Sequence, residues 1–65
     1  MLKEYIGKEY LVKDGSVVVV VGSCGRFLDI EVQEAGEGRQ PNDQEVVTDY
    51  VFFGRIKSGE YKEFP

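Results

Sequence analysis

The chain has 65 residues, a formal net charge of −4, no histidine and a single cysteine. These totals exclude an intramolecular disulfide, histidine catalysis and every metal site that needs histidine, and one thiol alone does not make a structural zinc site. A chain of this length buries only about 60% of the surface of its unfolded form, so we expect a single domain over residues 1–65 with a small core.

No membrane or export signal stands out in the sequence. The longest apolar run is five residues, at 17–21, whereas a membrane-spanning helix needs roughly 18. The first ten residues alternate charged and apolar side chains and lack the apolar core of a secretory signal. We therefore expect a cytoplasmic protein with no membrane partner. A single free thiol agrees with this location, because disulfides are rare in the reducing cytoplasm.

The N-terminal third predicts a helical turn followed by a β-hairpin. Leu2, Tyr5 and Ile6 have the spacing of one helical face, which favours a short turn there. Asp-Gly at 14–15 separates two β-rich runs and is a strong signal for a type I′ hairpin. We expect residues 8–13 to pair with residues 16–22.

The valine run at 17–21 has two apolar faces, because alternate side chains of a strand point in opposite directions. Val17, Val19 and Val21 would leave one face, and Val18 and Val20 the other. One face goes to the core. The second is covered by a bent strand, by the N-terminal turn or by another subunit, and the sequence leaves these three open.

The rest of the chain also has β-character. Gly22–Gly25 predicts a turn, residues 26–34 alternate clearly, and residues 34–45 form a polar loop that we expect to be mobile. Residues 46–57 predict a further strand, and Ser58-Gly59 a second tight hairpin before a short last strand.

A resemblance supports this arrangement. It rests on the pattern Gly7-Lys8-x-Tyr10-x-Val12-x-x-Gly15-x-Val17-x-x-Val20. This pattern resembles the opening hairpin of small SH3-like barrels, such as the translation-factor-like and Tudor-like domains and several small phage or bacterial proteins. It covers roughly the first 22 residues. The resemblance implies an all-β fold, a small five-stranded SH3-like barrel with a short N-terminal helical turn, and it carries over no functional residues.

The sequence offers little for catalysis. Cys24 stands beside Arg26, but a small residue in a turn is the favoured interpretation over a reactive thiolate. Glu31, Glu45 and Asp49 are best interpreted as part of a solvated acidic face. The glycines at 36 and 38 fit no dinucleotide fingerprint. We expect no enzyme activity, no metal and no cofactor.

The distribution of charged side chains along the chain is the basis for our hypothesis about function. Residues 29–49 hold seven acidic side chains against one basic, which favours a basic partner and opposes phosphate. We expect a small protein-interaction module, of the accessory type common in phages and mobile elements, acting alone or as a homo-oligomer. The candidate partner-binding residues are an apolar face with Val18, Val20, Tyr50 and Phe52, or an acidic loop with Glu34, Glu37 and Asp43.

The sequence leaves two alternative functions open. A nucleic-acid-binding barrel would use exposed aromatic side chains together with basic ones such as Arg26, Arg55 and Lys57. An acidic inhibitor would present carboxylates in place of phosphates to a basic nucleic-acid-binding protein.

Overall fold

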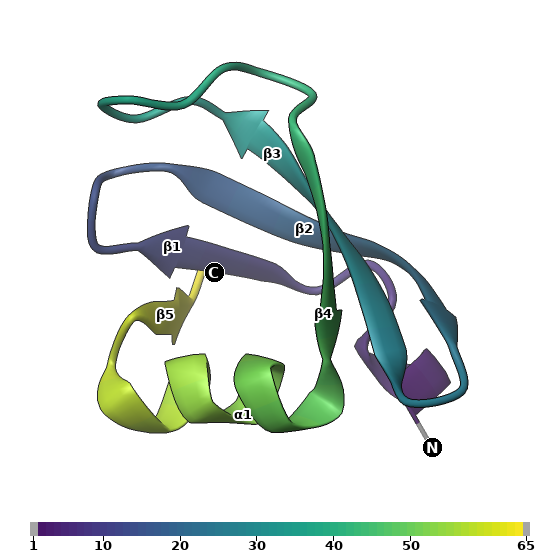
Figure 1. The fold of residues 1–65 in the computed structure, drawn as a ribbon. Helices are drawn as coiled ribbons and strands as arrows, with labels where there is room; N and C mark the ends of the chain where they lie inside the picture. The colour runs from purple at the N-terminus through teal and green to yellow at the C-terminus, as the bar shows by residue number, and fades with distance from the viewer. Residues whose placement is uncertain (1, 65) are drawn as a thin grey trace.

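A computed structural model describes residues 2–64 as five strands, one α-helix and one 3-10 helix (Figure 1). In chain order these are η1 (Leu2–Tyr5), β1 (Glu9–Val12), β2 (Val17–Cys24), β3 (Phe27–Glu34), β4 (Gln44–Thr48), α1 (Asp49–Ser58) and β5 (Tyr61–Glu63). The expected N-terminal turn, the first hairpin, the alternating strand and the number of strands are confirmed.

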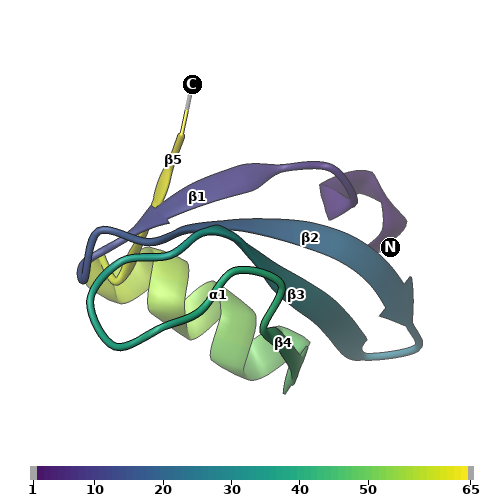
Figure 2. The ribbon, with the colours of Figure 1, turned by 90° about the horizontal axis from the view of Figure 1, so that it is seen from above.

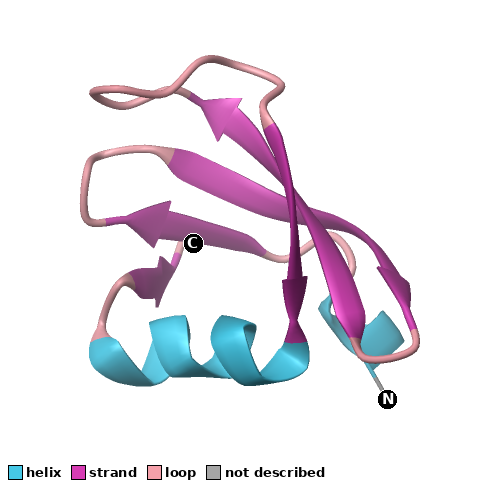
Figure 3. Ribbon diagram, viewed as in Figure 1, coloured by secondary structure: helices cyan, strands magenta, loops and turns pink. Residues whose placement is uncertain are grey.

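The five strands form one antiparallel sheet in the order β4-β3-β2-β1-β5. β4 and β5 are therefore the two edges of the sheet, and they stand apart with α1 joining them (Figure 3). The closed barrel that we expected is wrong, because the sheet is open. The reason is local: the chain coils into a helix after Thr48, which leaves β4 only five residues long.

The strand expected over residues 46–57 is wrong for most of its length, because Asp49–Ser58 is helical. Thr48 caps this helix: its side-chain oxygen accepts a hydrogen bond of 3.3 Å from the N–H of Val51. Gly59 ends it in the left-handed conformation, with φ of 86°. The expected hairpin at Ser58-Gly59 is thus the end of a helix.

Aromatic side chains connect α1 to the sheet. The helix lies across one face of the sheet (Figure 2), and Phe52 points from it into the core with no exposed surface. Its ring centroid lies 5.5 Å from that of Tyr10, 6.2 Å from that of Tyr61 and 5.6 Å from that of Tyr5, with edge-to-face geometry in each pair. Phe52 therefore joins η1, β1 and β5 in one core.

Alternate side chains of the valine run differ in burial as predicted from Val18 to Val21. The pairing of β2 with β3 shifts register between Val17 and Val18 and again between Val20 and Gly22, which changes the second face of the run. Val18 and Val20 are buried in the core, so they are not available to a partner. Val21 has no partner on β3, because the register shifts between Val20 and Gly22, and it is 44% exposed at this bulge.

On the outer face of the sheet, Val19 lies between its cross-strand neighbours Glu9 and Glu31 and is partly buried. Val21 is 44% exposed, so part of the second valine face lies on the surface of the sheet. Val17 is buried at the start of β2, outside the main core.

The turns differ in detail from the prediction. At the first hairpin only Gly15 has a positive φ, of 93°, and its N–H donates to the carbonyl of Val12 at 2.9 Å. The loop thus has three residues with a left-handed glycine at its end, and the expected type I′ turn is wrong. The expected turn at Gly22–Gly25 is also misplaced, since β2 runs through Cys24 and reverses at Gly25.

Candidate interaction surface

The outward side of α1 exposes aromatic side chains. Tyr50, Phe53, Gly54 and Lys57 follow one another at the spacing of a single helical face, and none of them is buried. Tyr50 is 83% exposed, the largest value among the exposed large apolar side chains of residues 2–64. Phe53 is 40% exposed, and its ring also packs against those of Tyr5 and Phe52, with 5.4 Å between the ring centroids in each pair.

These side chains surround a shallow hollow of about 570 Å³, here called the α1 hollow. Its lining consists of Arg26, Asp49, Tyr50, Val51, Phe53, Gly54 and Lys57. Six of the seven come from the helix, so the hollow depends on the helix that the sequence pattern did not predict.

The β2–β3 turn supplies the remaining wall. The N–H of Asp49 donates to the carbonyl of Arg26 at 2.8 Å, which ties the first residue of α1 to this turn. The Arg26 guanidinium also lies 3.5 Å from the Asp49 carboxylate. Because the Arg26 side chain is 79% exposed, this ion pair is open to solvent and contributes little to stability.

Gly54 leaves the floor of the hollow open. It lies in the interior of α1, and a Cβ built on it would meet no atom within 4 Å. The helix backbone is therefore accessible between the larger side chains of Tyr50 and Lys57. Nothing in the packing of the described residues requires a glycine here.

The hollow carries more positive than negative charge. It contains Arg26, Lys57 and one carboxylate, Asp49. Among residues 2–64, no carboxylate lies within 4.0 Å of the Lys57 ammonium. This local balance is opposite in sign to the net charge of the chain.

A second polar cluster joins the two edges of the sheet. Arg55 donates hydrogen bonds of 2.9 Å to both carboxylate oxygens of Glu45 on β4, and one of 2.9 Å to the Tyr61 hydroxyl on β5. The bond from Arg55 lowers the pKa of Glu45, and the same pair raises the pKa of Arg55. Burial raises the pKa of Tyr61. Because each group is paired, this cluster connects α1 to both edge strands.

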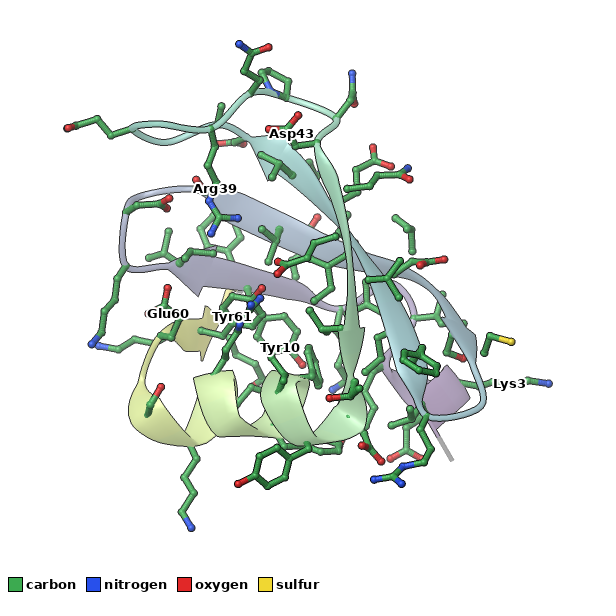
Figure 4. All side chains as sticks on the ribbon, viewed as in Figure 1. Lys3, Tyr10, Arg39, Asp43, Glu60 and Tyr61 are labelled. Atoms are coloured by element: carbon green, nitrogen blue, oxygen red, sulfur yellow. The ribbon has the colours of Figure 1, made fainter. Side chains whose placement is uncertain are left out.

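The polar loop 35–43 contacts the first hairpin. The N–H of Gly36 donates to the Ser16 hydroxyl at 2.9 Å, and the Arg39 guanidinium binds the Asp14 carboxylate at 2.9 Å. Figure 4 shows Arg39 reaching from the loop toward the hairpin of β1 and β2, while Asp43 stays at the end of the loop. A hydrogen bond from the Ser16 N–H lowers the pKa of Asp14. These contacts fix where the loop leaves the sheet.

The structure separates the candidate residues of the sequence prediction. Val18, Val20 and Phe52 lie in the core, whereas Tyr50 is exposed in the α1 hollow. The acidic candidates Glu34, Glu37 and Asp43 are exposed and lie between the end of β3 and the start of β4, whereas the helix follows the end of β4 (Figure 1). The predicted apolar surface therefore does not form from these residues, and Tyr50 alone remains from it.

Phe53 and Gly54 are surface residues that the sequence prediction missed. The signal was present in the caps: Thr48 precedes the segment and Gly59 follows it, as at many helix ends. With these two caps recognised, the spacing of 50, 53, 54 and 57 would have indicated an exposed helical face.

Other kinds of site find little support among residues 2–64. No three histidine, cysteine or acidic side chains lie close enough to hold a metal ion, and Cys24 is an exposed free thiol. In the part of the chain that is described, α1 is too short and too polar to span a membrane. The chain matches no protein-family model, and comparison with curated proteins and with solved structures gives no match.

Proposed function

We propose that this protein is a non-enzymatic, cytoplasmic protein-interaction module whose partner binds at the α1 hollow. The observation that carries the proposal is the exposure of Tyr50, Val51 and Phe53 around one hollow. An exposed apolar cluster with polar side chains at its rim is typical of a protein-binding site. Tyrosine and arginine, both present here, are enriched among the residues that contribute most to binding.

The distribution of aromatic side chains supports this choice. The core already contains Tyr10, Phe52 and Tyr61, which pack against one another. Tyr50 adds nothing to that packing, since most of its surface faces solvent. Because Tyr50 lies beside Val51 and Phe53, a partner that covers this cluster would remove a continuous apolar surface from water.

A non-enzymatic role fits the pairing of the charged groups. Asp49 in the hollow pairs with Arg26, and Glu45 at the sheet edges pairs with Arg55. The hydrogen bond from Arg55 lowers the pKa of Glu45, which makes this carboxylate a weak general base.

The proposal is tested by selecting random 12-residue peptides on the immobilised protein. Peptides that bind wild type should lose at least about tenfold in affinity for Tyr50→Ser, because a tyrosine anchor would be removed. The matched control is Val46→Ser, which changes another exposed apolar side chain, 64% exposed, on the outer sheet face. Failure to obtain binders, or equal affinity for Tyr50→Ser, would contradict the proposal.

Nucleic-acid binding is the second candidate function. It is favoured by the combination of Tyr50, Arg26 and Lys57 in one hollow, since base stacking and phosphate contacts need these side chains. Fluorescence anisotropy with a labelled oligothymidylate tests it. Binding that weakens steeply with salt and is lost in Tyr50→Ser would favour this function over the first.

A further inference from the structure

We propose that the α1 hollow binds an extended acidic peptide that contains an apolar side chain, and that Gly54 lets the peptide main chain lie against the helix. This inference rests on the proposed function and names the chemistry of its partner. In this arrangement the apolar side chain contacts Tyr50 and Phe53, and a neighbouring carboxylate lies between Arg26 and Lys57.

Gly54 occupies a position where glycine gives the fold itself no advantage. Glycine in the interior of a helix is destabilising relative to alanine. At this position the cost is not offset by packing, because a Cβ would meet no atom within 4 Å. Nor is it required by the backbone, since Gly54 is not among the glycines with a positive φ. What glycine does provide is close access to the helix backbone, which is a common use of the residue at binding sites.

The apolar side chain of the ligand follows from the walls of the hollow. Tyr50, Val51 and Phe53 are all partly or largely exposed and line the same space. A hollow of about 570 Å³ has room for one or two large side chains. An aliphatic or aromatic anchor would remove apolar surface from water on both partners.

The acidic character of the ligand follows from charge. Arg26 and Lys57 flank the hollow against a single carboxylate, while the chain as a whole carries −4. The net charge of the chain therefore opposes an acidic segment, whereas the two basic side chains of the hollow attract it. A basic segment would instead be drawn to the loop that carries Glu34 and Glu37.

The charges of the hollow and of the whole chain also favour a peptide over the other occupants. A nucleic-acid strand brings a phosphate at every residue and needs a longer basic track than two side chains. A second copy of this chain also carries −4, so two copies repel each other. Both remain as outcomes that the experiment can reveal.

The test uses the peptides selected on wild type, measured by isothermal titration. The selected sequences should be enriched in Asp or Glu within a few residues of an aliphatic or aromatic residue. Gly54→Ala should lower their affinity about fivefold or more while raising thermal stability, because its methyl group enters the floor of the hollow. Lys57→Glu should lower affinity about tenfold, and the matched control Lys62→Glu, on the exposed edge strand, should not.

The outcomes separate this inference from the proposed function. If peptides depend on Tyr50 but are rich in Lys or Arg, or bind Gly54→Ala as well as wild type, the inference is overturned and the interaction function stands. If no peptide depends on Tyr50, both are overturned. Oligothymidylate binding at Tyr50, or self-association in sedimentation that Tyr50→Ser abolishes, would also overturn the acidic-peptide assignment.

Discussion

Arg55 and Glu45 form a two-bond ion pair that joins α1 to the edge strand β4, with both N–O distances at 2.9 Å. Arg55 also donates to the Tyr61 hydroxyl on the opposite edge strand. The two edges of the sheet are not paired through their backbones. One arginine side chain therefore connects them, where a closed barrel would use a ladder of hydrogen bonds.

Replacement of this arginine should weaken the fold. Arg55→Met removes three hydrogen bonds and is expected to lower the free energy of unfolding by about 1–2 kcal/mol, since the pair is two-pronged but partly exposed. Urea unfolding followed by tyrosine fluorescence measures it, because the chain has no tryptophan. Lys57→Met, on the exposed side of the same helix, is the matched control and should change stability by less than about 0.5 kcal/mol.

The same pair predicts a pH dependence. Arg55 lowers the pKa of Glu45 below its usual 4.5, so its stabilising effect is complete above that value and is lost as pH falls through the lowered pKa. Glu45→Gln should therefore be less stable than wild type at pH 7, and the difference should shrink below about pH 4. In the Arg55→Met background, Glu45→Gln should have almost no effect at either pH; an undiminished effect there would contradict this pairing.

A close backbone contact at Gly36 should make that position intolerant of any side chain. A Cβ there would lie 2.5 Å from the Asp14 carbonyl oxygen and 2.6 Å from the Ser16 nitrogen. Gly36→Ala should displace the loop and lower the free energy of unfolding by about 1–3 kcal/mol. Gly54→Ala is the matched change and should raise stability by up to about 1 kcal/mol. Denaturation curves in which Gly36→Ala equals wild type would refute the docked position of the loop.

The start of α1 depends on one side chain. Thr48→Ala removes the oxygen that accepts from the Val51 N–H and should lower the free energy of unfolding by about 1 kcal/mol. Thr48→Ser keeps a side-chain oxygen at this position and should therefore retain most of the stability of wild type. Far-ultraviolet circular dichroism during thermal unfolding measures both variants. Equal melting temperatures for the alanine and serine variants would show that this cap is not used.

The sequence predicted the elements whose patterns are regular. The first hairpin and the strand at 27–34 were predicted because their side chains alternate and a glycine marks the turn. The helix was missed because valine, tyrosine and phenylalanine favour strands, and only Thr48 and Gly59 indicated otherwise. Bulges such as the one at Val21 depend on pairing with β3, which no local pattern reveals.

The candidate site was missed for the same reason. In a strand, Phe52 and Phe53 would point to opposite faces, and the sequence does not say which one is buried. In the helix, Phe52 packs among three tyrosines, and Phe53 lies at the edge of the hollow with Tyr50. Its side chains could be assigned to the surface or to the core only once the segment Asp49–Ser58 was known to be helical.

The central claim is that a partner binds on the outward side of α1, and amide chemical-shift mapping tests it most directly. Isotope-labelled protein is titrated with the tightest peptide from the selection. The account predicts that the largest shifts fall on Arg26 and on residues 49–57, with little change on the outer sheet face at Leu11 and Val21. Shifts concentrated on that face, or on the loop at 35–43, would contradict it.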